Sequence, residues 1–135
     1  MTGEIALANR QYENALKRMF ELKEEMDKTG ARWLLPDVLN LMGRSLLALG
    51  KNEEAFRSLE EARNEAEKQI SRRSLWVCLL SLAELEESQG HLEVGRKLRE
   101  EASSVVAFII DHIDDPDLRA AFLNLPRVKQ ATRGN

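Results

Sequence analysis

The chain has 135 residues, of which 43% are hydrophobic, 32% charged and 5% aromatic. Slightly more than half of them are Ala, Leu, Glu, Lys or Arg, a composition typical of long helices, whereas Val and Ile together number only 11 against 21 Leu. The composition therefore disfavours a sheet and predicts an all-α fold, and the length suits one domain. A formal net charge of −3 argues against a general nucleic-acid binder.

Several compartments are also disfavoured. The single cysteine, Cys78, cannot form an internal disulfide, which excludes a disulfide-stapled secreted domain. The first ten residues lack the basic start and apolar stretch of a secretory signal. The longest apolar runs, 75–80 and 105–110, have six residues each, whereas a membrane-spanning helix needs about 20. We expect a soluble, cytoplasmic protein with no membrane partner.

Apolar residues recur three or four apart along most of the chain, which predicts amphipathic helices separated by short turns. The expected helices are 12–28, 37–49, 52–70, 73–89 and 91–112. A last short helix, 117–125, is expected to begin after the N-cap Asp115 with Pro116 in its first turn, and to stop before Pro126. It is predicted to close the array as a capping helix by burying Leu118, Ala121, Phe122 and Leu125. The turns are short enough to require antiparallel hairpins.

The hairpins repeat at a fixed spacing of 40 residues. Gly50 and Gly90 are 40 apart, and the triplet at 60–62, Glu-Glu-Ala, returns unchanged at 100–102. Further matches on this spacing are Glu13, Glu53 and Glu93; Ala15, Ala55 and Gly95; Leu39 and Leu79; Met42 and Leu82; Gly43 and Ala83. The small residues predict close helix–helix approach, and Gly50 and Gly90 predict helix-ending turns with positive φ. A hairpin cannot bury its apolar face alone, so the repeats are expected to stack.

This pattern resembles the tetratricopeptide repeat, in its longer form of about 40 residues per unit. The second unit carries the resemblance best, with packing residues at Leu39, Met42, Gly43, Leu46, Gly50, Ala55, Leu59 and Ala62. The third unit departs from it at Glu86 and Arg99. The resemblance implies stacked antiparallel hairpins in a right-handed superhelix over residues 1–126. Its expected parts are a partial unit 1–30, units 31–70 and 71–112, the capping helix 115–125, and then a basic tail, 127–135.

Projecting the second unit back by 40 places residue 1 in the middle of a first helix. We therefore expect the C-terminal piece of a longer array, or else a shortened first hairpin covered by a partner. On the first reading an N-terminal apolar face with Ile5, Leu7, Tyr12 and Leu16 would self-associate into a homo-oligomer. Residues 118–126 also resemble the closing segment of such arrays in large bacterial signalling and regulatory proteins.

Catalytic and metal chemistry find little support in the sequence. His91 and His112 are expected at helix ends, and Cys78 lies inside an all-apolar segment, where a buried structural thiol is expected. These three positions do not have the clustered spacing of a zinc site, and no cofactor is expected. The acidic cluster 111–117 lacks the glycine and terminal glutamate of a calcium loop and is better explained by helix capping. We expect no enzyme.

In resembling proteins the first helix of each hairpin lines a concave face that binds peptides or partner helices. The corresponding candidate positions are Asp37, Asn40, Arg44 and Leu47, then Val77, Leu80, Glu84 and Glu87. The expected function is a non-enzymatic protein–protein interaction module, the C-terminal part of a larger bacterial regulatory protein. The alternative is a domain that senses a small ligand or signal peptide and controls an attached effector. A packed face without a ligand also stays open.

Overall fold

The computed structural model describes the backbone of residues 2–133 and the side chains of residues 8–132. This part of the chain is all-helical. The helices are α1 (Thr2–Thr29), α2 (Leu35–Ala48), α3 (Asn52–Lys68), α4 (Arg72–Ser88), α5 (Leu92–Asp111), α6 (Pro116–Leu123) and α7 (Pro126–Arg133). The predicted all-α class is confirmed, and the predicted bounds of α2 to α5 hold to within two residues.

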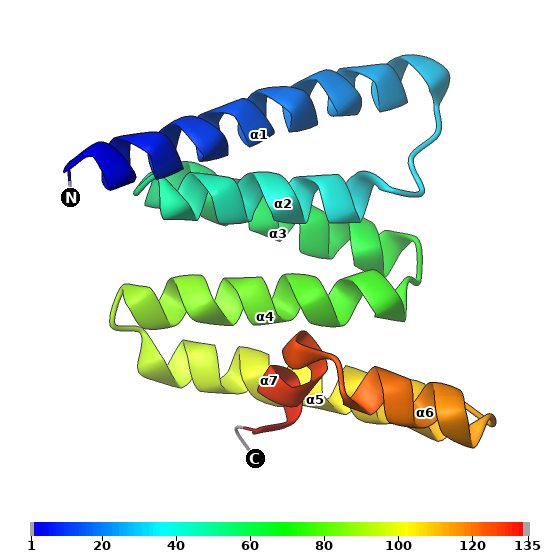
Figure 1. Ribbon diagram of the computed structural model, residues 1–135. Coiled ribbons are helices and arrows are strands. Elements are labelled where there is room, and N and C mark those ends of the chain that lie inside the picture. The colour runs from blue at the N-terminus through cyan, green and yellow to red at the C-terminus, as the bar shows by residue number, and fades with distance from the viewer. Residues whose placement is uncertain (1, 134–135) are drawn as a thin grey trace.

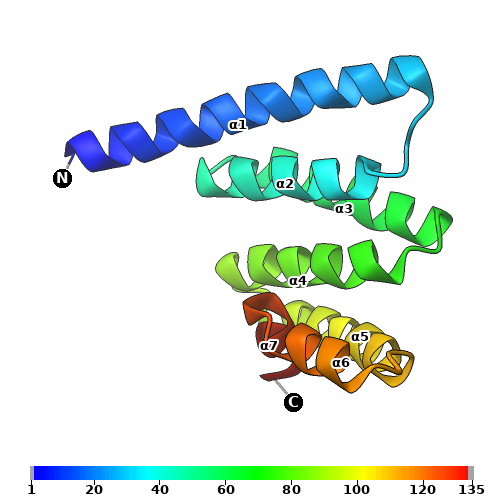
Figure 2. The ribbon, with the colours of Figure 1, turned by 45° about the vertical axis from the view of Figure 1, so that its right-hand side comes forward.

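The closest helix pairs are α2–α3 and α4–α5, each joined by a tight turn (Figure 1). The long helix α1 packs on α2, and α3 packs on α4, so the two hairpins stack beneath α1. In both views α2 lies in front of α3, and α6 and α7 lie in front of α5 (Figure 2). We call the side formed by α1, α2, α4, α6 and α7 the front face.

The tight turns form as the glycine pattern predicts. Gly50 and Gly90 have φ of +78° and +84°, in the left-handed region that glycine enters at no steric cost. Ile70 also has a positive φ, 55°, although it is β-branched, and it stands 40 residues after Gly30 at +77°. The turn at Ile70 is therefore made in spite of its residue type.

The predicted close approach inside the first hairpin is confirmed. A Cβ atom on Gly43 would lie 2.5 Å from Leu59 Cγ and 3.3 Å from the carbonyl oxygen of Ala55. Leu59 is fully buried, so it has nowhere to move. The missing side chain at Gly43 is what allows α3 to lie this close to α2.

In the second hairpin an ion pair replaces the apolar contact of the first. Leu47 packs against the core cluster that contains Leu59, whereas 40 residues later Glu87 meets Arg99. Two parallel hydrogen bonds join them, from Arg99 Nε at 2.7 Å and Nη2 at 2.8 Å. The Arg99 hydrogen bonds lower the pKa of Glu87. The departure of the third unit is therefore a matched exchange of both partners.

The first helix differs from its prediction, because α1 begins at Thr2 rather than at residue 12. The position one repeat before Gly50 and Gly90 is Arg10, which has no preference for the left-handed turn that would separate two helices there. The helix therefore continues without a break. Leu16 is half-buried and Tyr12 is 42% exposed, while the side chains of Ile5 and Leu7 lie outside the described residues.

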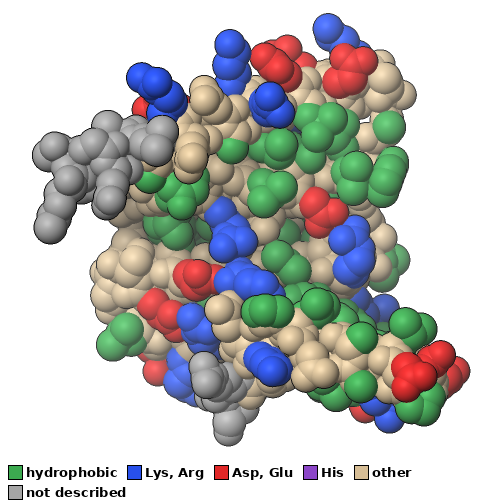
Figure 3. All heavy atoms as spheres, viewed as in Figure 1, with side chains coloured by type: hydrophobic (Ala, Val, Ile, Leu, Met, Phe, Trp, Pro, Cys, Tyr) green, Lys and Arg blue, Asp and Glu red, His purple; other side chains and the backbone are tan. Residues whose placement is uncertain are grey.

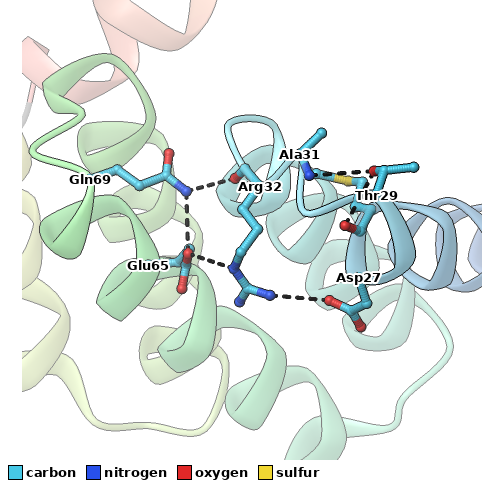
Figure 4. Close-up of polar contacts among 7 residues, drawn as sticks. Asp27, Thr29, Ala31, Arg32, Glu65 and Gln69 are labelled. Carbon is cyan, nitrogen blue, oxygen red and sulfur yellow. Dashed lines mark hydrogen bonds and ion pairs between the residues drawn. The ribbon is translucent and has the colours of Figure 1, made fainter.

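The loop after α1 is tied to the end of α3 by polar contacts (Figure 4). Arg32 bonds to Asp27 Oδ1 at 3.1 Å and to Glu65 Oε1 at 3.4 Å. Gln69 Nε2 donates to the Arg32 carbonyl oxygen at 2.6 Å. The contacts fix α1 against the first hairpin across a span of more than thirty residues of sequence.

The C-terminal segment corrects two predictions. Helix α6 buries none of its residues, and of the predicted capping residues Leu118, Ala121 and Leu125 are exposed while Phe122 is half-buried, edge-on to Trp76 with ring centroids 6.3 Å apart. The predicted basic tail instead begins as helix α7, whose Val128 and Ala131 are buried in the cluster of α4 and α5. Pro126 therefore starts a helix, since its missing N–H costs nothing in a first turn.

Candidate binding pocket

The front face carries a pocket of about 400 Å³ between α1, α2 and α4. We call it the α2 pocket, because α2 contributes most of its lining. The lining residues are Tyr12, Leu41, Arg44, Ser45, Leu47, Ala48, Ser81 and Glu84. Figure 3 shows hydrophobic side chains gathered over the α1–α2 layer, with basic and acidic side chains where this layer meets the lower one. A volume of this size lies near the lower end of the range for ligand sites.

Helical spacing explains which residues of α2 reach the pocket. Leu41, Arg44, Ser45 and Ala48 are three or four residues apart, so they lie on one stripe of the helix. The opposite stripe of α2 carries buried residues such as Leu39 and Met42, which join the core. The pocket is thus the solvent side of an amphipathic helix that is walled by its two neighbours.

Three of the eight candidate positions from the sequence line this pocket. They are Arg44, Leu47 and Glu84. Tyr12, Leu41, Ser45, Ala48 and Ser81 were missed; four of these lie next to or one turn from a candidate position, and the stripe rule would have included them. Tyr12 comes from α1 and carries no signal of its own in the sequence.

The other candidate positions serve the fold. Asp37 accepts a hydrogen bond from Ser74 Oγ at 3.1 Å and pairs with Arg73 at 3.1 Å, which joins α2 to α4. Leu80 is fully buried and Val77 is partly buried against the same core. Glu87 pairs with Arg99 inside the second hairpin. These four residues do not line the α2 pocket.

Asn40 is a special case among the candidates. Its side chain is only 5% exposed, and its Oδ1 atom has no hydrogen-bond partner among the described residues. A buried acceptor without a donor costs roughly 1–3 kcal/mol. Asn40 is not among the residues that line the pocket, so it is not available to a ligand there as the sequence suggested.

The C-terminal helix reaches the lower edge of the pocket. Arg127 Nη1 on α7 lies 2.6 Å from Glu84 Oε1, and Nη2 lies 3.5 Å from Ser81 Oγ. The Arg127 side chain is 24% exposed and that of Glu84 is 38% exposed. The negative charge of Glu84 is therefore already balanced by a residue of the same chain.

The residues considered for chemistry do not come together. His91 Nδ1 lies 2.7 Å from Glu86 Oε2 at the start of α5, and His112 Nδ1 lies 2.8 Å from the Phe108 carbonyl oxygen at its end. Cys78 is 1% exposed, and burial, with a smaller contribution from Asp37, raises the pKa of its thiol to about 12. Asp115 caps α6 by accepting from the backbone N–H of Asp117 at 2.8 Å, as predicted.

Within residues 2–133 no group of three or more His, Cys, Asp or Glu side chains is placed to hold a metal ion. In the same part of the chain no helix has the length and apolar content to cross a bilayer.

No protein-family model, curated protein or solved structure matches this chain. Its assignment to the tetratricopeptide family therefore rests on the residue pattern and is a proposal.

Proposed function

We propose that this chain is a non-enzymatic interaction module of the tetratricopeptide type, which binds a peptide or a partner helix of another protein at the α2 pocket. The observation that carries the proposal is the pocket itself: three helices from different parts of the sequence converge on about 400 Å³ of open, mostly apolar space. Tyr12 and Leu41 remain 42% and 48% exposed there. Large apolar side chains left open around one pocket favour a protein partner.

The proposal includes the module's place in a larger regulatory protein of bacterial origin. The resemblance of residues 118–126 to closing segments supports this, together with the incomplete first unit on the 40-residue spacing. The interaction is expected to use the first helix of the second unit, α2, because α4 is already covered in part by α7.

A peptide-array screen tests the function. The purified chain is probed against an array of diverse peptides, in parallel with the variants Arg44→Glu and Arg57→Glu. Arg57 is an exposed arginine on α3 outside the α2 pocket, so its variant carries the same charge change at a control position. We expect a set of peptides that bind the wild type and Arg57→Glu but not Arg44→Glu. Binding that is equal for all three proteins would remove the α2 pocket as the site.

A further inference from the structure

The α2 pocket has an unbalanced charge that indicates the chemistry of its partner. Two charged side chains line it, Arg44 and Glu84. Glu84 is paired with Arg127, whereas Arg44 is exposed and makes no hydrogen bond or ion pair with any residue whose side chain is described. The pocket therefore presents one free cation beside a neutralised pair.

The 40-residue repeat shows how the same position is satisfied elsewhere in the chain. Arg44 on α2 and Glu84 on α4 are equivalent on this spacing, with opposite charges. Glu84 receives its counter-ion from a separate helix, α7, which packs apolar residues beside it. In the earlier unit the charge is reversed, and the described residues supply no counter-ion to Arg44.

The surroundings of Arg44 suit a carboxylate that is attached to an apolar segment. Ser45 lies next to it in the lining, and its hydroxyl has no partner among the described side chains. Tyr12 and Leu41 supply exposed apolar surface at the same pocket. A guanidinium and a hydroxyl both donate to carboxylate oxygens, and charge-assisted hydrogen bonds are the stronger kind.

We propose that the partner presents a Glu or Asp side chain, flanked by apolar residues, whose carboxylate binds Arg44 and Ser45 while the flanking side chains contact Tyr12 and Leu41. This inference rests on the function proposed above and specifies the partner of that site. Complementary charge at such a position selects among partners as well as strengthening binding. Replacing the acid by its amide is expected to weaken binding about tenfold.

Three blocked pentapeptides test this inference: acetyl-Ala-Leu-Glu-Leu-Ala-amide and its counterparts with Gln or Lys in the centre. Blocked ends leave the central side chain as the only difference in charge. Each peptide is titrated into isotope-labelled protein while the backbone amide resonances of residues 41–48 are followed by NMR. We expect the Glu peptide to shift these resonances, and the Gln peptide to need about ten times the concentration.

The variants make the result specific to Arg44. The Arg44→Glu protein is expected to lose the Glu peptide and gain the Lys peptide, while Arg57→Glu behaves as the wild type. A Gln peptide with a free C-terminus that binds as well as the blocked Glu peptide would show a terminal carboxylate as the ligand and overturn the side-chain assignment.

Two other outcomes would also overturn the inference. Equal binding of the Glu and Gln peptides would remove the acidic partner but leave the proposed function intact, since that depends on the array result. Resonances of residues 41–48 that do not respond to any peptide would contradict an acidic anchor at this pocket. An array set that depends on Arg44 would, in that case, still support a partner of different chemistry.

Discussion

Ile70 is the residue at which backbone and side chain disagree most. It is the one non-glycine residue with positive φ in the described part of the chain, and 76% of its side chain is exposed, so packing does not compensate for the strain. A left-handed conformation costs an L-residue roughly 1–2 kcal/mol. The equivalent position one repeat earlier is Gly30, which adopts the same turn freely.

We therefore expect Ile70→Gly to increase the free energy of unfolding by about 1 kcal/mol, even after the greater backbone entropy of glycine in the unfolded chain is counted. Urea denaturation followed by circular dichroism measures the change. The control is Val94→Gly, at a half-exposed position inside α5, which is expected to destabilise by about 1 kcal/mol. An equal loss of stability in both variants would contradict strain at Ile70.

At the scale of helix pairs, the two hairpins tolerate a methyl group differently. Gly43→Ala places a Cβ atom 2.5 Å from Leu59 Cγ, and Leu59 is fully buried. Overpacking of this kind costs roughly 1–3 kcal/mol, more than the gain of up to about 1 kcal/mol from removing a helical glycine. We expect a lower melting temperature.

Gly95→Ala is the matched comparison. Its added Cβ would lie 2.5 Å from Glu87 Cγ, but the Glu87 side chain is 31% exposed and can move. We expect a change in stability smaller than that of Gly43→Ala, measured by thermal denaturation of both variants. If Gly95→Ala were the more damaging of the two, the close approach in the second hairpin would be the tighter one.

The Glu87–Arg99 pair gives the second hairpin a dependence on pH. Hydrogen bonds from Arg99 lower the pKa of Glu87 from its ordinary value of 4.5. The stabilisation is therefore complete above that ordinary value and is lost as pH falls through the lowered pKa of the folded state. We expect Glu87→Gln to cost about 0.5–1 kcal/mol at pH 7, since the pair is partly exposed.

The test is the difference in unfolding free energy between wild type and Glu87→Gln at a series of pH values. It is expected to be constant above about pH 5.5 and to shrink towards zero in more acid solution. A difference that grows as pH falls would mean that the carboxylate is not stabilised by Arg99 in the folded state.

The helices that the sequence predicts best are those with both a repeat partner and a glycine stop. Gly50 and Gly90 end α2 and α4 as expected, whereas the start of α1 was missed because Arg10 stands where a turn glycine would be needed. Pro126 was ambiguous, since proline both ends helices and begins them. Its second role gives α7.

The pocket could be predicted only in part, for a related reason. The repeat placed Arg44 and Glu84 on the correct helices, but Glu87 turned out to be committed to Arg99, whose side chain arrives from the next helix. Helical spacing shows which residues share a face. It does not show which of them a neighbouring helix already occupies.

For the whole molecule, α7 closes the array that α6 was expected to close. Val128 is fully buried against the cluster that contains Trp76, which is 5% exposed. Val128→Asp would bury a charge, so α7 is expected to detach instead and expose Trp76. We expect stronger acrylamide quenching of Trp76 fluorescence, measured in a Trp33→Phe background because Trp33 is 67% exposed.

Lys129→Asp is the control, because Lys129 is the exposed neighbour of Val128 on the same helix. It is expected to leave the quenching unchanged. Quenching that is also unchanged in Val128→Asp would show that α7 does not protect the core at this end.

Photo-cross-linking at the α2 pocket tests most directly whether this chain binds a partner there. Benzoylphenylalanine replaces Leu41 in the pocket, or Phe56 on α3 as a control of similar exposure, 48% against 40%. Each protein is irradiated with a peptide selected on the array. We predict a covalent adduct from position 41 and none from position 56. Adducts from position 56 alone, or equally from both, would contradict binding at the α2 pocket.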